Sequence, residues 1–198
     1  MDKLTKHSTG DWDYSGTNWA LDSAKYISAP SAFRTNLGLN IEVLIKTTTV
    51  PIGYVKEGRL VTYFQLTHDN GSWKTDLDVR FRKQDASNYY YVRFQRDLTA
   101  IYFCKVVAGS TTTIRTKAIS WTKLGVWHLV RVTWWNDYVG LVIRVERFEN
   151  GAWTFIDEAY DSENLWKTIG GRVGFFFDGV GDPMFNNWLD DTEIYGIG

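Results

Sequence analysis

The stretch Trp127-His-Leu-Val-Arg-Val-Thr-Trp134 and the stretch Leu141-Val-Ile-Arg-Val-Glu146, which follows it after a short connection, decide the fold class. Apolar and polar side chains alternate along most of both segments, and a period of two residues is typical of a β-strand with one buried face. Because the turn formers Asn136-Asp137 lie between them, the two segments predict neighbouring antiparallel strands. The same alternation occurs earlier in the chain, in Arg59–Leu66, Leu77–Arg82 and Tyr89–Gln95.

Turn signals separate the alternating segments at short intervals, for example at Asp69-Asn-Gly71, Ala108-Gly-Ser110 and Glu149-Asn-Gly151. About a dozen short strands divided in this way predict an all-β protein, an antiparallel two-sheet β-sandwich of the jelly-roll type. Asp161–Trp166 is the only segment with the signals of a helical turn.

The chain has 198 residues, three prolines and no break in composition, so residues 1–198 are predicted to form a single domain. Residues Thr9–Asn18, within the segment 1–24, are rich in turn formers and offer little core. Residues 1–24 are expected to be an irregular segment that Trp12 and Trp19 pin onto the sandwich.

Strand parity assigns each side chain to a core face or to an outer face. The expected core positions are Leu60, Phe64, Leu66, Leu77, Val79, Phe81, Tyr90, Val92, Phe94, Val130, Val132, Trp134, Leu141, Ile143 and Val145. The single cysteine, Cys104, is expected to be a buried, inert thiol, and His128 is expected to be an exposed member of its strand.

The composition excludes several classes of protein. Lys and Arg number 22 against 23 Asp and Glu, so the chain has no general electrostatic attraction to nucleic acid. No apolar run is long enough for membrane insertion, and the N-terminal residues are not expected to form a signal peptide. We therefore expect a virion component or a module cut from a secreted protein, with the localisation and the oligomeric state left open.

Four motifs in order resemble a known family. Gly125–Trp134 resembles the Trp-His-x-Val strand of laminin G-like domains, and Arg147–Gly151 resembles their next strand and its Asn-Gly turn. Gly171–Phe175 with Trp188–Ile194 is similar to the closing strands of the concanavalin A-like lectin/glucanase superfamily, and Tyr26–Arg34 to its opening strand. The resemblance implies a jelly roll. Because the superfamily includes lectins, carbohydrate-binding modules, glycosidases, lyases and virion proteins, the resemblance alone does not assign a function.

Jelly rolls of this superfamily have a concave sheet face that is their usual glycan groove. Aromatic rings that stack on sugars and planar polar groups that bind hydroxyls suit such a groove. The candidate carbohydrate-binding residues are Tyr63, Asp78, Arg80, Arg82, Tyr89, Tyr91, Arg93, Arg131 and Trp135. The arginines among them also permit an acidic or sulfated glycan as the partner. In the alternative interpretation, the same side chains are cross-strand pairs that keep the sheet soluble and in register.

An enzyme is disfavoured. Asp76-Leu-Asp78 resembles the start of the Glu-x-Asp-x-(x)-Glu strand motif of laminarinase-type glucanases, but Arg80 occupies the place of the second catalytic carboxylate. Arg80 and Arg82 are expected to hold both aspartates ionised. We therefore predict a non-catalytic carbohydrate-binding or adhesion module, with a structural or receptor-binding virion protein as the alternative and a hydrolase or lyase as the weaker one.

One structural calcium ion is the only cofactor that the sequence suggests. The resemblance implies an ion between the last strand and the opening segment, where Asp190, Asp11 and Asp13 would be ligands. Asp190 shares strand parity with Ile194, so it is expected to point inward, where a carboxylate requires a cation or hydrogen-bond donors. In the alternative interpretation, Asp190 caps loop amides without a metal.

Overall fold

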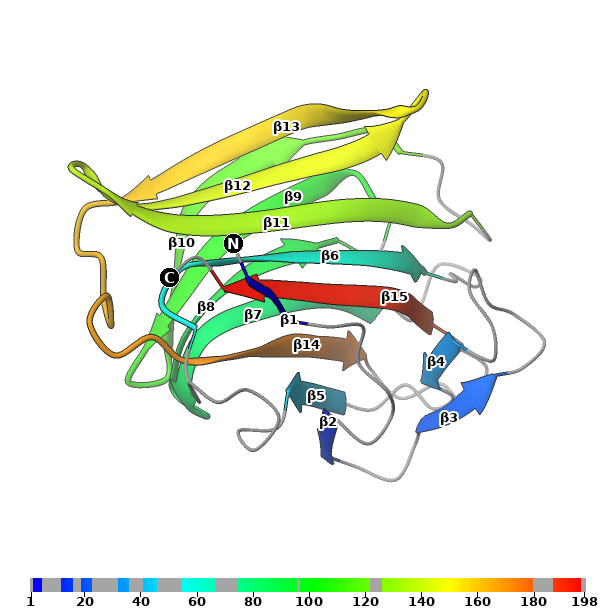
Figure 1. The fold of residues 1–198 in the computed structure, drawn as a ribbon, viewed down its shortest axis with the longest axis horizontal. Helices are drawn as coiled ribbons and strands as arrows, with labels where there is room; N and C mark the ends of the chain where they lie inside the picture. The colour runs from blue at the N-terminus through cyan, green and yellow to red at the C-terminus, as the bar shows by residue number, and fades with distance from the viewer. Residues whose placement is uncertain are drawn as a thin grey trace.

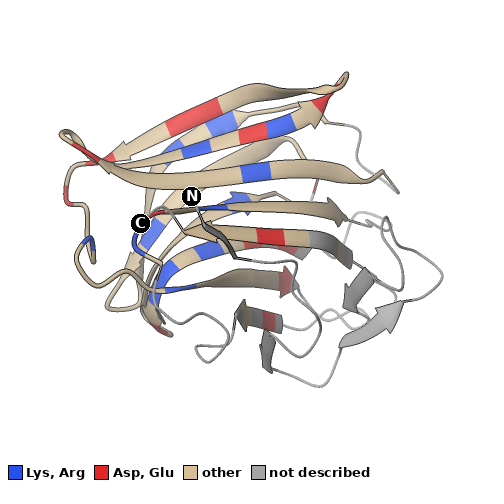
Figure 2. Cartoon of the chain, in the orientation of Figure 1, with Lys and Arg blue, Asp and Glu red and all other residues tan. Residues whose placement is uncertain are grey.

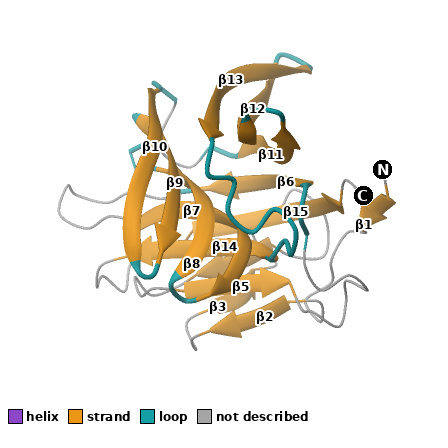
Figure 3. Ribbon diagram, turned by 90° about the vertical axis from the view of Figure 1, so that its left-hand side faces the viewer, coloured by secondary structure: helices purple, strands orange, loops and turns teal. Residues whose placement is uncertain are grey.

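A computed structural model describes residues 2–4, 12–15, 19–22, 32–35, 41–45, 55–66, 75–95, 97–121, 126–179 and 187–196. The described residues form strands, turns and loops (Figure 3). Their strands are β1 (Asp2–Leu4), β2 (Trp12–Ser15), β3 (Trp19–Asp22), β4 (Ala32–Thr35), β5 (Ile41–Ile45), β6 (Gly58–Gln65), β7 (Thr75–Asp85), β8 (Asn88–Phe94), β9 (Ala100–Val107), β10 (Ser110–Ala118), β11 (His128–Asp137), β12 (Gly140–Glu149), β13 (Ala152–Asp161), β14 (Arg172–Gly179) and β15 (Asn187–Gly196). Within this part of the chain, no helix has the length and apolar character that a membrane crossing requires.

The strands form two antiparallel sheets that face each other (Figure 1). Sheet A has the order β13-β12-β11-β6-β15-β4-β3, with β1 also paired to β15, and sheet B has the order β10-β9-β8-β7-β14-β5-β2. Because the chain passes from one sheet to the other between β6 and β7, between β10 and β11 and again after β13, neighbours in sequence are often not neighbours in a sheet. The predicted all-β sandwich is confirmed.

The core lies between the sheets and consists of the apolar positions that the alternation assigned to it. All fifteen predicted core residues are buried in one cluster. Its aromatic rings pack directly on one another, with 4.8 Å between the ring centroids of Phe81 and Trp134 and 5.1 Å between those of Phe64 and Phe94. Cys104 is buried, as predicted, although it lies on the outer side of sheet B in a small cluster with Tyr91 and Val106.

One expectation about the N-terminal segment needs correction. Residues 2–4, 12–15 and 19–22 form strands that pair with β15, β5 and β4, so the segment 1–24 is not wholly irregular. Strands of three or four residues are too short to show a period of two. The side chains of Trp12 and Trp19 lie outside the described part of the structure.

Two local expectations are also wrong. His128 is buried rather than exposed, because it shares the inward parity of Val130 in β11, and its ring stacks on that of Trp121 at 5.5 Å. The segment 161–166 forms turns instead of a helical turn. Asn164 and Trp166 have φ angles of +46° and +59°, which lie outside the helical region.

Arg82 is the main exception to strand parity. The pairing of β7 with β8 shifts register between Phe81 and Asp85, and Arg82 has a φ angle of +48°. A Cβ atom on Gly171 would lie 2.1 Å from the carbonyl carbon of Arg82, so only glycine permits this approach of the two backbones. The bulge turns the Arg82 side chain away from the outer face.

The Arg82 guanidinium is fully buried and holds four acceptors from three parts of the chain. It donates to the Lys56 carbonyl at 2.8 Å, to Asn136 Oδ1 at 2.8 Å, and to Asn164 Oδ1 and the Leu165 carbonyl at 2.7 and 3.1 Å. Arg82 is therefore not a candidate for ligand binding; it links sheet B to a strand of sheet A and to the connection before β14.

We expect Arg82→Met to lower the free energy of unfolding by at least about 3 kcal/mol, because several buried acceptors lose their donor together. Urea unfolding followed by tryptophan fluorescence measures the change. Arg144→Met is the control, since the half-exposed Arg144 pairs with Glu158 at the surface and should cost less than about 1 kcal/mol. Equal losses in the two variants would contradict the role assigned to Arg82.

Candidate functional site

The predicted carbohydrate-binding residues divide between the two sheets. Tyr63 lies in β6, and Arg131 and Trp135 lie in β11, all in sheet A. The strands β7 and β8 of sheet B carry the others, namely Asp78, Arg80, Tyr89, Tyr91 and Arg93, with Arg82 turned inward. One groove cannot contain the whole set, since the core separates the two outer faces.

Asp78 and Arg93 form the centre of the sheet B face. They are directly opposite each other on β7 and β8, and Arg93 binds both carboxylate oxygens of Asp78, with Nε at 2.6 Å and Nη2 at 2.9 Å. Nη2 also donates to Asp178 at 2.9 Å, and Nη1 lies 3.2 Å from Asp76. Asp76 and Asp178 are themselves opposite each other on β7 and β14. Since like charges in that position repel, the Arg93 guanidinium compensates the pair.

Arg80 extends this network toward β5. Its Nη1 donates to Glu42 at 2.6 Å, and its guanidinium carbon lies 3.7 Å from the ring centroid of Phe176 and 4.5 Å from that of Tyr89. Lys83 approaches the same Glu42 carboxylate at 3.3 Å. The predicted cross-strand pairing of charged and aromatic side chains therefore describes this face correctly.

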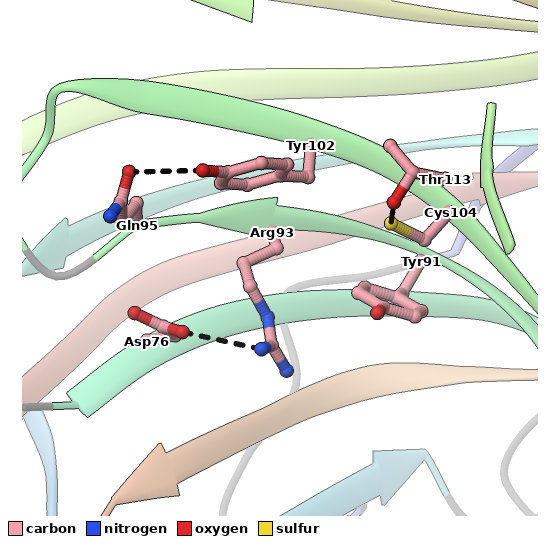
Figure 4. Close-up of a pocket in the computed structure, with 7 residues that line it drawn as sticks. All are labelled: Asp76, Tyr91, Arg93, Gln95, Tyr102, Cys104 and Thr113. Atoms are coloured by element: carbon pink, nitrogen blue, oxygen red, sulfur yellow. Dashed lines mark hydrogen bonds and ion pairs between the residues drawn. The ribbon is translucent and has the colours of Figure 1, made fainter. Parts of the chain in front are cut away.

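A pocket of about 270 Å³ opens beside Arg93 (Figure 4). Its lining comes from four neighbouring strands and joins two tyrosine rings to amide, hydroxyl, thiol and charged groups: Asp76, Tyr91, Arg93, Gln95, Tyr102, Cys104 and Thr113. The Tyr102 hydroxyl donates to Gln95 Oε1 at 3.4 Å, and the Cys104 thiol donates to Thr113 Oγ1 at 3.7 Å.

Sequence reasoning identified Tyr91 and Arg93 but not the rest of this lining as site residues. Tyr102 and Thr113 are in β9 and β10, the two strands at the end of sheet B. Tyr102 is half-buried between two fully buried neighbours, Ile101 and Phe103, so the alternation of β9 was a usable signal.

Burial controls the ionisation of the site. It raises the pKa of Asp78 to about 6, although Arg93 and Arg80 act in the opposite direction. The arginines therefore do not bring the pKa of Asp78 below its ordinary value, because burial outweighs them. Burial disfavours the charged form of Arg93 as well, but the hydrogen bonds and charges of Asp78 and Asp76 outweigh it and raise the Arg93 pKa. Burial also raises the pKa of Tyr91 and that of Cys104, so neither is activated as a nucleophile.

The outer face of sheet A consists of ion pairs and aromatic rings in cross-strand rows. Arg131 binds the Glu146 carboxylate with both Nε and Nη2 and lies 4.4 Å from the ring centroid of Trp153. Arg144 lies 5.0 Å from the Trp135 ring. Arginines lie beside Asp and Glu on β11 and β12, whereas β13 carries only acidic charged residues, Asp157, Glu158 and Asp161 (Figure 2).

The sequence matches no family model and no curated protein. Several solved structures have a fold similar to that of this chain. The carbohydrate binding module CBM66 from Bacillus subtilis has a TM-score of 0.57 at 14% identity, over 92% of this chain and 93% of the module. The exoplasmic/lumenal domain of VIP36 in its Ca2+/Man3GlcNAc-bound form has a TM-score of 0.62 at 12% identity, over 99% of this chain and 88% of that one. The Bacteroides ovatus xyloglucan-locus protein GH43B has a TM-score of 0.56 at 12% identity, over 99% of this chain and 39% of that one.

The chain has the concanavalin A-like lectin/glucanase fold. The resemblance carried by the four sequence motifs is thereby confirmed for the fold.

The side chains of the predicted calcium ligands are not described. Asp11 and the side chains of Asp13 and Asp190 lie outside the described part of the chain, and within that part no group of three His, Cys, Asp or Glu is arranged to hold a metal. The backbone adds two facts. Asp13 is in sheet B and Asp190 in sheet A, so an ion held by both would bridge the sheets. β15 shifts register between Asp190 and Glu193, so parity with Ile194 does not give the direction of Asp190.

The raised pKa of Asp78 predicts a pH dependence of stability. Between its ordinary pKa of 3.8 and the folded-state value of about 6, the folded protein binds a proton that the unfolded chain has released. Stability therefore falls as the pH rises through this window, by up to about 3 kcal/mol.

Urea unfolding at about pH 4 and about pH 7.5 measures this loss as the difference between the wild type and Asp78→Asn, whose amide does not titrate. The wild type should lose more stability than the variant when the pH is raised. Identical pH dependences would show that Asp78 keeps an ordinary pKa in the folded protein.

Proposed function

We propose that the protein binds carbohydrate without chemical conversion, through the pocket beside Arg93 on the outer face of sheet B. The lining of that pocket carries the proposal. Two tyrosine rings, an amide and hydroxyl groups line one small depression, and sugars are bound by such combinations of ring faces with planar hydrogen-bonding groups. All of the lining residues except Gln95, which directly follows β8, come from paired β-strands, which hold a site more precisely than loops do.

The similar structures support this choice of function class. One is a carbohydrate binding module by name, and the VIP36 domain was solved with Man3GlcNAc and with mannose. At 11–14% identity these likenesses are of fold, so they support a glycan partner without indicating which sugar. None of these similar structures supports the alternative of a virion protein.

Catalysis is disfavoured because the carboxylates of this face are already held in ion pairs. A glycosidase requires one carboxyl group as the acid and a second as the nucleophile or base, both directed at the glycosidic bond. Asp76 and Asp78 are both engaged by Arg93, and Asp78 is almost fully buried. The GH43B protein is one similar structure whose name points to an enzyme, and the match covers only 39% of its chain.

A glycan array with isothermal titration of the hits tests the proposal. We expect Tyr102→Ala and Gln95→Ala each to weaken binding about tenfold, because each removes a ring face or a planar hydrogen-bonding group from the pocket. Trp135→Ala is the matched control, since it removes an aromatic ring from the outer face of sheet A and should leave the affinity unchanged.

Three other outcomes would overturn the proposal. Loss of binding in Trp135→Ala alone would place the site on sheet A. The absence of any binding at millimolar glycan would favour a structural role. New reducing ends or unsaturated products after incubation with mixed polysaccharides would establish an enzyme.

We further propose one calcium ion at Asp190 that stabilises the fold and takes no part in sugar binding; Ca2+-bound forms of VIP36 are among the similar structures. A bound ion stabilises the folded state by about 2.7 kcal/mol at a hundredfold excess over its Kd. Chelation should therefore lower the melting temperature by several degrees, and Asp190→Ala should abolish that response while sugar binding persists at low temperature. A melting curve that neither calcium nor chelator changes would show that Asp190 holds no ion.

A further inference from the structure

The outer face of sheet A carries two buried polar atoms on directly paired residues. Arg59 and Thr133 are opposite each other on β6 and β11. The Nε of Arg59 and the Oγ1 of Thr133 are both closed to solvent, and neither has a hydrogen-bond partner among the residues that the structure describes. Because a buried polar atom without a partner is costly, two of them on one strand pair point to an external group that binds both.

Arg59 differs in its ion pairing from the other arginines of this face. Arg131 binds Glu146 and Arg144 binds Glu158, and each of these two arginines uses its Nε for the carboxylate. Arg59 forms no ion pair within the described part of the chain. Its Nε and its charge are therefore left for a ligand.

Strand pairing places Thr133 between two arginines. Its parity directs it to the outer face, yet it is only 7% exposed. Arg59 is opposite it on β6 and Arg144 on β12, and residues in such positions have Cβ atoms about 4.5–5.5 Å apart. On β15, Tyr195 is opposite Arg59, and its hydroxyl donates to Glu193. The acidic side chain of this part of β15 thus already accepts a hydrogen bond.

We propose that Arg59 and Thr133 form a binding site for a tetrahedral oxyanion, sulfate or phosphate, on the outer face of sheet A. The guanidinium supplies the charge and two parallel N–H bonds, as arginine ordinarily does for such anions, and the Thr133 hydroxyl donates to a further oxygen. Arg59 as a whole is partly exposed, so an anion reaches it from solvent. The core separates this site from the sheet B pocket, so the inference goes beyond the proposed function and does not depend on it.

The test compares Thr133→Val and Arg59→Met with Arg147→Met. Valine keeps the shape of threonine, and because the hydroxyl has no described partner, Thr133→Val should be at least as stable as the wild type. Arg147→Met is the matched control, since it removes the same charge from sheet A at a position opposite the core residue Val130. Circular dichroism and melting curves establish that each variant is folded, and Thr133→Val keeps the test decisive if Arg59→Met does not fold.

The probes are sodium sulfate and sodium phosphate, titrated by NMR with the amide signals of Arg131 and Arg144 as reporters. Sodium chloride keeps the ionic strength constant, so that general screening does not change. We expect saturable shifts in the wild type and in the control. The affinity should fall at least about tenfold in Arg59→Met and about tenfold in Thr133→Val, because each loses a charge-assisted hydrogen bond. The amide signals of Tyr91 and Tyr102 in the sheet B pocket should not move.

A chondroitin sulfate tetrasaccharide and its desulfated form identify the source of the anion. If the sulfated tetrasaccharide binds at least about tenfold more tightly than inorganic sulfate, the site takes a sulfate group carried by a glycan. Equal affinities would assign it to the free ion. Equal binding of the desulfated form would instead show that the site takes a carboxylate, which contradicts the inference.

Three further results would overturn the inference: no saturable shift at millimolar sulfate and phosphate, unchanged anion affinity in both site variants, or a clear loss of stability in Thr133→Val, which would show that its hydroxyl has a partner within the protein. Failure of the proposed function has a different signature. It appears on the glycan array and in Tyr102→Ala, and neither result changes the sulfate titration of sheet A.

Discussion

The buried guanidinium of Arg82 is the interaction on which the arrangement of both sheets depends. A cation taken out of water is tolerated only where its donors are satisfied, and Arg82 meets this condition with acceptors from the segment before β6, from the end of β11 and from the connection before β14. The bulge that turns Arg82 inward interrupts the pairing of β7 with β8, so β7 is regular only in the residues before the bulge. Asp78 and Arg80 lie in that regular part and keep their outward direction, so the outer face that carries the pocket ends where the bulge begins.

A second buried network acts on the same connection between β13 and β14. Lys105 pairs with Asp161 and Glu163 at 2.9 Å, and the Tyr90 hydroxyl donates to Asp161 Oδ2 at 2.5 Å while it accepts from the Leu165 amide at 3.0 Å. The connection is therefore held from β7, β8 and β9 together. Because β9 also carries Tyr102 and Cys104 of the pocket, the contacts that close this end of the sandwich also fix one of the strands on which the pocket is built.

The alternation of the sequence was sufficient to predict the core, because burial of one apolar face is the main stabilising contribution to a strand and each strand shows it locally. It was insufficient for Arg82, whose direction depends on a bulge and on the approach of Gly171 from a distant part of the chain. It also could not assign strands to sheets. Tyr63 and Tyr91 look equivalent in sequence, yet β6 and β8 belong to different sheets, and only the crossover after β6 separates them.

The two outer faces show why side-chain types alone do not identify a site. Both are built from arginines that pair with carboxylates across strands and lie over aromatic rings, as Arg131 does on sheet A and Arg80 on sheet B. The face of sheet B differs in having a described pocket, where Gln95, Tyr102 and Thr113 add uncharged polar groups to the charged network. The many aromatic residues serve more than one purpose as well. Rings such as Trp134 and Phe64 pack in the core, Trp135 and Trp153 lie under arginines on sheet A, and Tyr91 and Tyr102 line the pocket, so aromatic content alone does not identify a binding surface.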